Sequence, residues 1–158
     1  MQEQHKQLSV RQWHELAQNG VRIPMRTQLD GVSMQPLIRR NRDYVTIIYP
    51  ERWLVRGDIV LFTDSRGKYV VHRICRLDKE RVQTFGDNCD YPDAWMPYGN
   101  ILGLVVSVER GGKTYCLDSD ASRRWGDFWM KSYPLRRPFR KAYRFVRRAL
   151  GYLKRKIF

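Results

Sequence analysis

The chain has 158 residues, of which 42% are hydrophobic and 13% aromatic, and this composition is sufficient for one packed domain. Its 30 lysines and arginines outnumber its 16 acidic residues, which gives a formal net charge of +14. No apolar run approaches the ~18–20 residues that cross a bilayer, and no N-terminal pattern indicates a signal peptide. Three cysteines, Cys75, Cys89 and Cys116, lack CxxC spacing, so they suit a reducing compartment rather than a disulfide framework or a metal site.

The first predicted element is a short amphipathic helix. Ser9 is a suitable N-cap, and Asn19-Gly20 is a suitable end. Between them, apolar residues recur at helical spacing: Val10, Trp13, Leu16 and Ala17. Over residues 21–29 the pattern changes to alternating apolar and polar residues, which predicts a half-buried strand that leads towards Ser33.

Short β-rich runs follow, separated by Gly, Asp, Asn and Pro. They cover residues 43–49, 58–63, 68–77, 81–85, 101–109 and 113–117. Many short strands behind a single helix predict a mainly β, barrel-like fold. We therefore expect an N-terminal helix over residues 1–20 and a β-domain over residues 21–120.

The composition changes near residue 121, where we expect a separate tail over residues 121–158. Residues 123–158 contain thirteen lysines and arginines against one acidic residue, so this segment carries +12 of the net +14. From Leu135 to Ile157, apolar residues recur at spacings of three and four while basic residues occupy the other face, which predicts a basic amphipathic helix. Trp125, Phe128 and Trp129 precede it as amphipathic anchors.

Three roles are open to this tail. Its apolar stripe could pack on the β-domain, its arginines could contact nucleic-acid phosphates, or it could lie in an anionic membrane surface. No nucleic-acid recognition motif accompanies the charges, so we expect the membrane surface as the partner rather than nucleic acid. The basic residues expected to contact that surface are Arg136, Arg137, Arg140, Lys141, Arg144, Arg147 and Arg148.

Four short blocks in the β-domain contain residues suited to nucleophilic catalysis. They are Gly-Val-Ser-Met-Gln-Pro at 31–36, Gly-Asp-Ile-Val-Leu-Phe at 57–62, Val-Val-His-Arg-Ile at 70–74 and Gly-Asp-Asn at 86–88. A serine hydroxyl becomes a nucleophile when a neighbouring base takes its proton. Imidazole, with a pKa near 6.5, can accept that proton near neutral pH. A carboxylate on the other ring nitrogen would hold the required tautomer.

The order of these four blocks resembles the signal peptidase I superfamily of serine peptidases, although each block alone would be a weak signal. In that family the serine of G-x-S-M-x-P is the nucleophile, which implies this role for Ser33. Bacterial members use a lysine base, whereas the endoplasmic-reticulum and archaeal-type members use a histidine in a V-H-R-[VI] context. The resemblance therefore implies that His72 is the base. It covers about residues 21–110 and implies a coiled β-fold, but most family members also have transmembrane anchors.

Two aspartates are the main candidates for the carboxylate that orients His72. Residues 86–93 resemble the G-D-N…D segment of the histidine-type family, and counting eight positions from Gly86 places Asp93 on the triad aspartate of that family. Asp87 would then be structural, with Asp90 a further candidate. Asp87 remains the alternative to Asp93, because hydrogen bonding to His72 depends on geometry.

The oxyanion hole is expected to consist of backbone N–H groups. Some bacterial relatives have a hydroxyl residue two positions before the nucleophile as an extra donor, and this chain has Gly31 there. The donors must therefore come from the backbone near Gly31, including the N–H of Ser33.

These features predict a peripheral membrane-associated serine endopeptidase that cleaves an extended leader or signal peptide, with no metal or cofactor. The resemblance implies a preference for cleavage after small residues. The alternatives are a maturation or self-processing peptidase for a specific precursor, and a non-catalytic module that binds anionic lipid or nucleic acid through its tail. The odd number of cysteines and the basic tail favour the cytoplasmic face of the membrane, whereas ordinary signal peptidases act on the other face.

Overall fold

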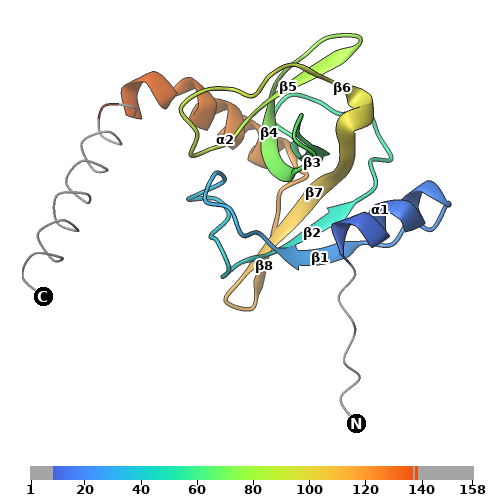
Figure 1. Cartoon of the computed structure of the whole chain (residues 1–158). Helices are drawn as coiled ribbons and strands as arrows, with labels where there is room; N and C mark the ends of the chain where they lie inside the picture. Colours follow the sequence, from blue (N-terminus) through green and yellow to red (C-terminus); the bar gives the residue numbers. More distant parts are fainter. Residues whose placement is uncertain (1–8, 137, 139–158) are drawn as a thin grey trace, which may run out of the picture.

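The computed structural model describes residues 9–136 and 138, and within them the chain forms one antiparallel sheet of eight strands with three short helices (Figure 1). The helices are α1 (Val10–Gln18), the 3₁₀ helix η1 (Tyr98–Asn100) and α2 (Asp120–Lys131). The strands are β1 (Met25–Gln28), β2 (Tyr44–Ile48), β3 (Ile59–Thr63), β4 (Tyr69–Leu77), β5 (Arg81–Phe85), β6 (Met96–Pro97), β7 (Ile101–Arg110) and β8 (Lys113–Cys116). The predicted mainly β class is confirmed.

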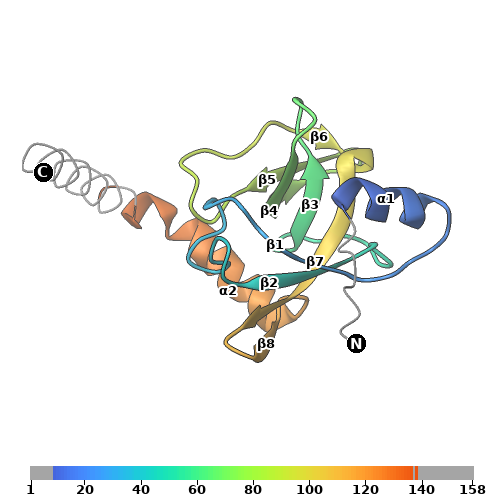
Figure 2. The same cartoon turned by 60° about the horizontal axis from the view of Figure 1, so that its bottom comes forward.

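The sheet curls into an open half-barrel (Figures 1 and 2). Its strand order is β1-β2-β7-β3-β4-β5-β6, with β8 paired to β7, so β1 and β6 form the two ends. The register shifts in three strand pairs, β2–β7, β3–β7 and β4–β5. Such bulges bend a strand and increase its twist, which accounts for much of the curl. In both views α1 and α2 lie on opposite sides of the sheet.

The N-terminal helix agrees with the prediction, but the strand after it is shorter than predicted. Ser9 caps α1 in a capping box with Gln12, and Trp13 is fully buried. β1 begins only at Met25, because Pro24 has no backbone N–H to donate and the carbonyl of Ile23 accepts a hydrogen bond from Trp13 Nε1 at 2.7 Å. The other predicted strands match to within one or two residues, whereas β6 was missed because two residues carry no periodicity.

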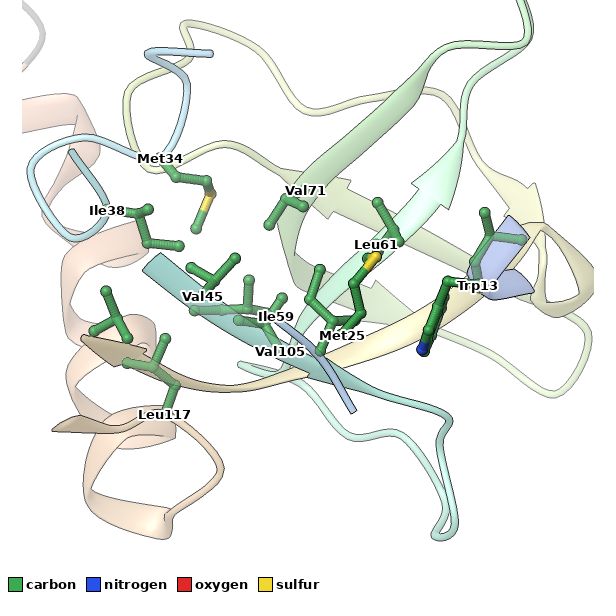
Figure 3. Packing of buried hydrophobic residues seen from close by; sticks show 13 residues of the cluster. Trp13, Met25, Met34, Ile38, Val45, Ile59, Leu61, Val71, Val105 and Leu117 are labelled. Carbon is green, nitrogen blue, oxygen red and sulfur yellow. The ribbon is translucent and has the colours of Figure 1, made fainter. Parts of the chain in front are cut away.

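A hydrophobic cluster joins the loop between β1 and β2 to the sheet (Figure 3). Met34 and Ile38 of that loop are at most 2% exposed and lie in one cluster with the sheet residues Val45 and Val71. Met34 directly follows Ser33, and Val71 directly precedes His72. Core packing of Met34 and Ile38 therefore fixes the loop that carries Ser33 to the sheet.

The domain boundary expected at residue 121 falls inside α2. Ser119 caps this helix, and Gly126 is buried against the guanidinium of Arg73 on β4. Trp129 Nε1 donates a hydrogen bond to the carbonyl of Asp87 at 3.1 Å. The β-domain therefore continues through α2. No helix in the described range is long and apolar enough to cross a membrane.

Most of the basic residues assigned to membrane contact lie outside the described residues: Arg137, Arg140, Lys141, Arg144, Arg147 and Arg148. Arg136 is described. Its guanidinium lies over the ring of Trp129 at 3.6 Å from the ring centroid and donates to the carbonyl of that tryptophan. This arginine is therefore engaged with α2 in the structure.

Candidate active site

The centre of the candidate site is a hydrogen bond between His72 and Asp93. His72 lies in the middle of β4, with its ring buried and tilted against Phe62 of β3 at a centroid distance of 6.0 Å. His72 Nδ1 lies 2.6 Å from Asp93 Oδ2. An ionised carboxylate can accept hydrogen bonds but cannot donate them. Nδ1 therefore carries the proton, and Nε2 is the basic nitrogen when the ring is neutral.

Asp93 is itself held in place by two residues of β5 that the sequence analysis did not single out. Thr84 Oγ1 donates to Asp93 Oδ2 at 2.6 Å, and Gln83 Nε2 donates to the Asp93 carbonyl at 2.9 Å. The Asp93 backbone N–H also donates to the Thr84 carbonyl at 2.8 Å. These bonds orient the carboxylate towards His72. No sequence motif marks Thr84 or Gln83, because Thr and Gln are ordinary strand residues.

Asp87, the alternative acid, has a different partner. Its two carboxylate oxygens accept from Arg73 Nε at 3.0 Å and from Arg73 Nη2 at 2.9 Å. Both side chains are almost fully buried. Arg73 Nη1 also donates to the Gly57 carbonyl at 2.9 Å, so this cation is fully engaged. Asp90, the third candidate, accepts from the Tyr133 hydroxyl at 3.0 Å.

Ser33 lies on the neighbouring loop, which is attached to the turn after β5. Asn88 N–H donates to the Ser33 carbonyl at 2.6 Å, and Asn88 Nδ2 donates to the Val32 carbonyl at 3.0 Å. The Gly-Asp-Asn block thus contacts the serine block directly. Among residues 9–136, no hydrogen bond joins the Ser33 hydroxyl to His72.

The far end of the Ser33 loop is fixed by a buried carboxylate. Asp43 accepts hydrogen bonds from Arg39 and Arg110, and Arg110 also donates to the Leu37 carbonyl at 2.8 Å. Burial alone would raise the pKa of Asp43, but the bonds from Arg110 and Arg39 outweigh it and hold the pKa well below its usual range. This carboxylate stays charged at neutral pH and fastens the loop to β7.

The Nε2 edge of His72 faces Gly86 and Cys89. A Cβ on Gly86 would come within 2.5 Å of Cys89 Sγ and 2.8 Å of His72 Nε2, so only glycine fits between them. Cys89 Sγ lies 3.9 Å from His72 Nε2. No sequence motif marks this cysteine as a site residue. Its position three residues after Gly86 was the available signal.

The proposed oxyanion donors are partly accessible. Ser33 is half-buried, and its backbone N–H donates to no group in the described part of the chain. A Cβ on Gly31 would lie 3.8 Å from Ser33 Oγ, so a side chain at this position would border the hydroxyl.

The pKa of His72 is raised to about 9. Burial of the ring acts in the opposite direction, since it disfavours the charged imidazolium. The hydrogen bond to Asp93 and the contact with Cys89 outweigh that effect. An unshifted histidine would be mostly neutral at pH 7, whereas on the order of 1% of a group with this pKa is neutral there.

Two further features bear on ligands. Among the described residues, no group of three or more His, Cys, Asp or Glu side chains could hold a metal ion. A cavity of about 890 Å³ lies among Tyr49, Trp53, Leu77 and Tyr98, and no residue of the His72 site lines it. The candidate site is therefore defined by the geometry around His72.

The chain matches no protein-family model and no curated protein.

We expect Asp87 to act on stability. Asp87→Asn leaves the Arg73 charge buried without its partner, which in comparable buried pairs costs about 3–5 kcal/mol of unfolding free energy. Asp30→Asn is the matched control, because Asp30 forms an exposed pair with Arg40 and its loss should change little. Urea unfolding measures both variants. Equal, small losses in the two variants would contradict the structural role of Asp87.

We expect the raised pKa of His72 to be visible in solution. The imidazole signals in an NMR titration should move through a midpoint near 9, and Asp93→Asn should shift that midpoint down, because burial then acts without the carboxylate. His72→Gln identifies the signals. Since the folded chain binds this proton more tightly than the unfolded chain, stability should fall as pH rises from about 6.5 through about 9. A midpoint that Asp93→Asn leaves unchanged would show that the carboxylate does not raise the pKa.

Proposed function

We propose that this chain is a serine endopeptidase, similar to the histidine-type signal peptidases, that hydrolyses a peptide bond in an extended peptide near a membrane surface. The observation that carries the proposal is the His72–Asp93 hydrogen bond of 2.6 Å, with the Ser33 loop bonded to the adjacent turn. This is the base and the orienting acid of a serine triad, with a serine in the neighbouring segment.

In the proposed reaction, which requires the neutral form of His72, Ser33 Oγ transfers its proton to His72 Nε2 and attacks the scissile carbonyl. The Ser33 N–H donates to the oxyanion, and Asp93 stabilises the imidazolium. His72 then returns the proton to the leaving amine, and water hydrolyses the acyl-enzyme by the same route. The hydrogen bond from serine to base must form with the substrate in place, as is common for catalytic contacts that tighten only in the complex.

An extended substrate has an available strand edge beside Ser33. β1 is the end strand of the sheet and pairs only with β2 in the described structure, and the chain passes from β1 into the Ser33 loop. A peptide could add to this edge through backbone hydrogen bonds, which require an extended conformation. The preference for small residues at the cleavage site belongs to the family resemblance.

The membrane part of the proposal is supported by exposed apolar residues on α2 and just after it. Trp125, Phe128 and Leu135 are each more than half exposed, although they are large and apolar. The end of α2 and the residues just after it lie beside the loop of residues 86–93. Trp129 donates a hydrogen bond to the Asp87 carbonyl, and the Tyr133 hydroxyl donates one to Asp90. The basic segment therefore follows directly after a helix that touches the site, and an anionic surface would complement both the aromatic and the cationic residues.

The nucleophile is tested with a fluorophosphonate, which reacts covalently with activated serines. We expect the label on Ser33, no label in Ser33→Ala, and a rate lowered by about 10²–10⁴ in His72→Ala, because the base is lost. Mass mapping of the labelled peptide is the readout. With a cleaved peptide as substrate, the double variant should be little worse than either single variant.

Ser65→Ala is the matched control, since Ser65 is an exposed serine in the turn between β3 and β4. It should label as the wild type does. A label on Cys89, or a label that persists in Ser33→Ala, would overturn Ser33 as the nucleophile.

The membrane role is tested by removing residues 139–158, which contain eight lysines and arginines and no acidic residue. This truncation keeps Trp129, Tyr133 and Arg136 in the chain. The full chain should sediment with vesicles that contain phosphatidylglycerol, less so at high salt, while the truncated chain should not. Fluorophosphonate labelling of Ser33 should be the same in both. Sedimentation of the truncated chain would refute the role of the tail, and binding of the full chain to DNA but not to vesicles would favour nucleic acid as the partner.

A further inference from the structure

A second nucleophilic side chain lies at the candidate site, in line with the same base and acid. Cys89 Sγ is 3.9 Å from His72 Nε2, and Asp93 Oδ2 is 2.6 Å from His72 Nδ1. Thiol, imidazole and carboxylate thus form a continuous chain. The sulfur is turned to the nitrogen that must accept a proton from any nucleophile, and Gly86 leaves the space for this contact.

The surroundings of the other two cysteines are different. Cys75 on β4 donates to the Gln83 carbonyl at 3.2 Å, and burial raises the pKa of its thiol. Cys116 is exposed on β8, opposite Ser107 of β7. A thiol is reactive as the thiolate, and a neighbouring imidazole promotes that form by taking the proton. Cys89 is the half-buried cysteine that has such a neighbour.

We propose that Cys89 is a reactive thiol of this site that exchanges with small disulfides, and that its mixed disulfide blocks the basic nitrogen of His72. In the exchange, the Cys89 thiol passes its proton to Nε2 of the neutral His72 ring, and its sulfur attacks one sulfur of the disulfide. The old S–S bond breaks as the new one forms. The departing thiolate takes the proton back from the imidazolium and leaves as a thiol, so the small disulfide is the only oxidant consumed.

The blocking step follows from the position of the sulfur. An added group on Cys89 extends from an atom that already touches the Nε2 edge of His72. The Ser33 carbonyl accepts a hydrogen bond from the N–H of Asn88, the residue before Cys89. The added group on Cys89 therefore also lies near the path by which Ser33 would reach His72. This part of the inference rests on the proposed peptidase function, whereas the reactivity of Cys89 does not.

The reactivity is tested on the full chain with glutathione disulfide, by following the mass of each cysteine peptide with time. Cys89 should be modified about tenfold or more faster than Cys116, although Cys116 is the exposed one. His72→Gln should remove this advantage, and Asp93→Asn should reduce it. Cys75 reports on folding, because it should stay slow in every folded variant. If Cys116 reacts as fast as Cys89, or if Cys89 reacts equally fast in a folded His72→Gln chain, the proposal is overturned.

The blocking step is tested by fluorophosphonate labelling of Ser33 after exposure to the disulfide. Labelling should fall in proportion to the fraction of Cys89 modified and recover with dithiothreitol. Cys116→Ser, which changes an exposed strand residue, should respond as the wild type does. Full Ser33 labelling with Cys89 fully modified would overturn the block. Absence of Ser33 labelling in the untreated chain would instead contradict the peptidase function, while the cysteine rates would still decide the reactivity of Cys89.

Discussion

The buried ion pair between Arg73 and Asp87 connects the segments on which the candidate site depends. Arg73 comes from β4, one residue after His72, and Asp87 comes from the turn that contacts Ser33. The same guanidinium binds the carbonyl of Gly57 and packs on Gly126 of α2. A cation in this position is tolerated only when each of its hydrogen bonds is satisfied, so burial of Arg73 requires all four segments to be in place together.

Three of the four sequence blocks meet at this ion pair. Gly57, Arg73 and Asp87 belong to separate blocks. The Arg73 guanidinium donates hydrogen bonds to the Asp87 carboxylate and to the Gly57 carbonyl. The fourth block, around Ser33, is held by Met34 in the core and by the hydrogen bonds of Asn88, the residue after Asp87. The chemistry at His72 can therefore be separated from the framework: Asp93 acts on the imidazole, whereas Asp87 maintains the position of the strand and the turn.

The helix α2 relates the site to the rest of the molecule. One side of it covers Arg73 and the turn at Asp87, and its exposed residues include Trp125 and Phe128. A membrane surface bound by Trp125 and Phe128 would lie against α2, and α2 is hydrogen-bonded to the turn at Asp87. Under the proposed function, α2 would then connect a membrane-facing surface with the turn at Asp87.

The sequence by itself determined the local structure, because alternation, capping and turn residues act over a few positions. It predicted the Ser9 cap, most strands and the mainly β class, and it singled out Ser33, His72, Asp87 and Asp93. The change of composition near residue 121 does not mark the end of the packed structure, because composition records charge, not packing, and α2 buries Gly126 against a residue 53 positions earlier.

Only the tertiary structure decided which aspartate contacts His72, since the two candidates lie six residues apart and hydrogen bonding depends on the path of the loop. It also decided that Cys89 lies at Nε2 and that the pKa of His72 is raised, because both depend on groups brought together across the sheet. Local patterns select elements, whereas proton affinity and contact depend on distances that no local pattern contains.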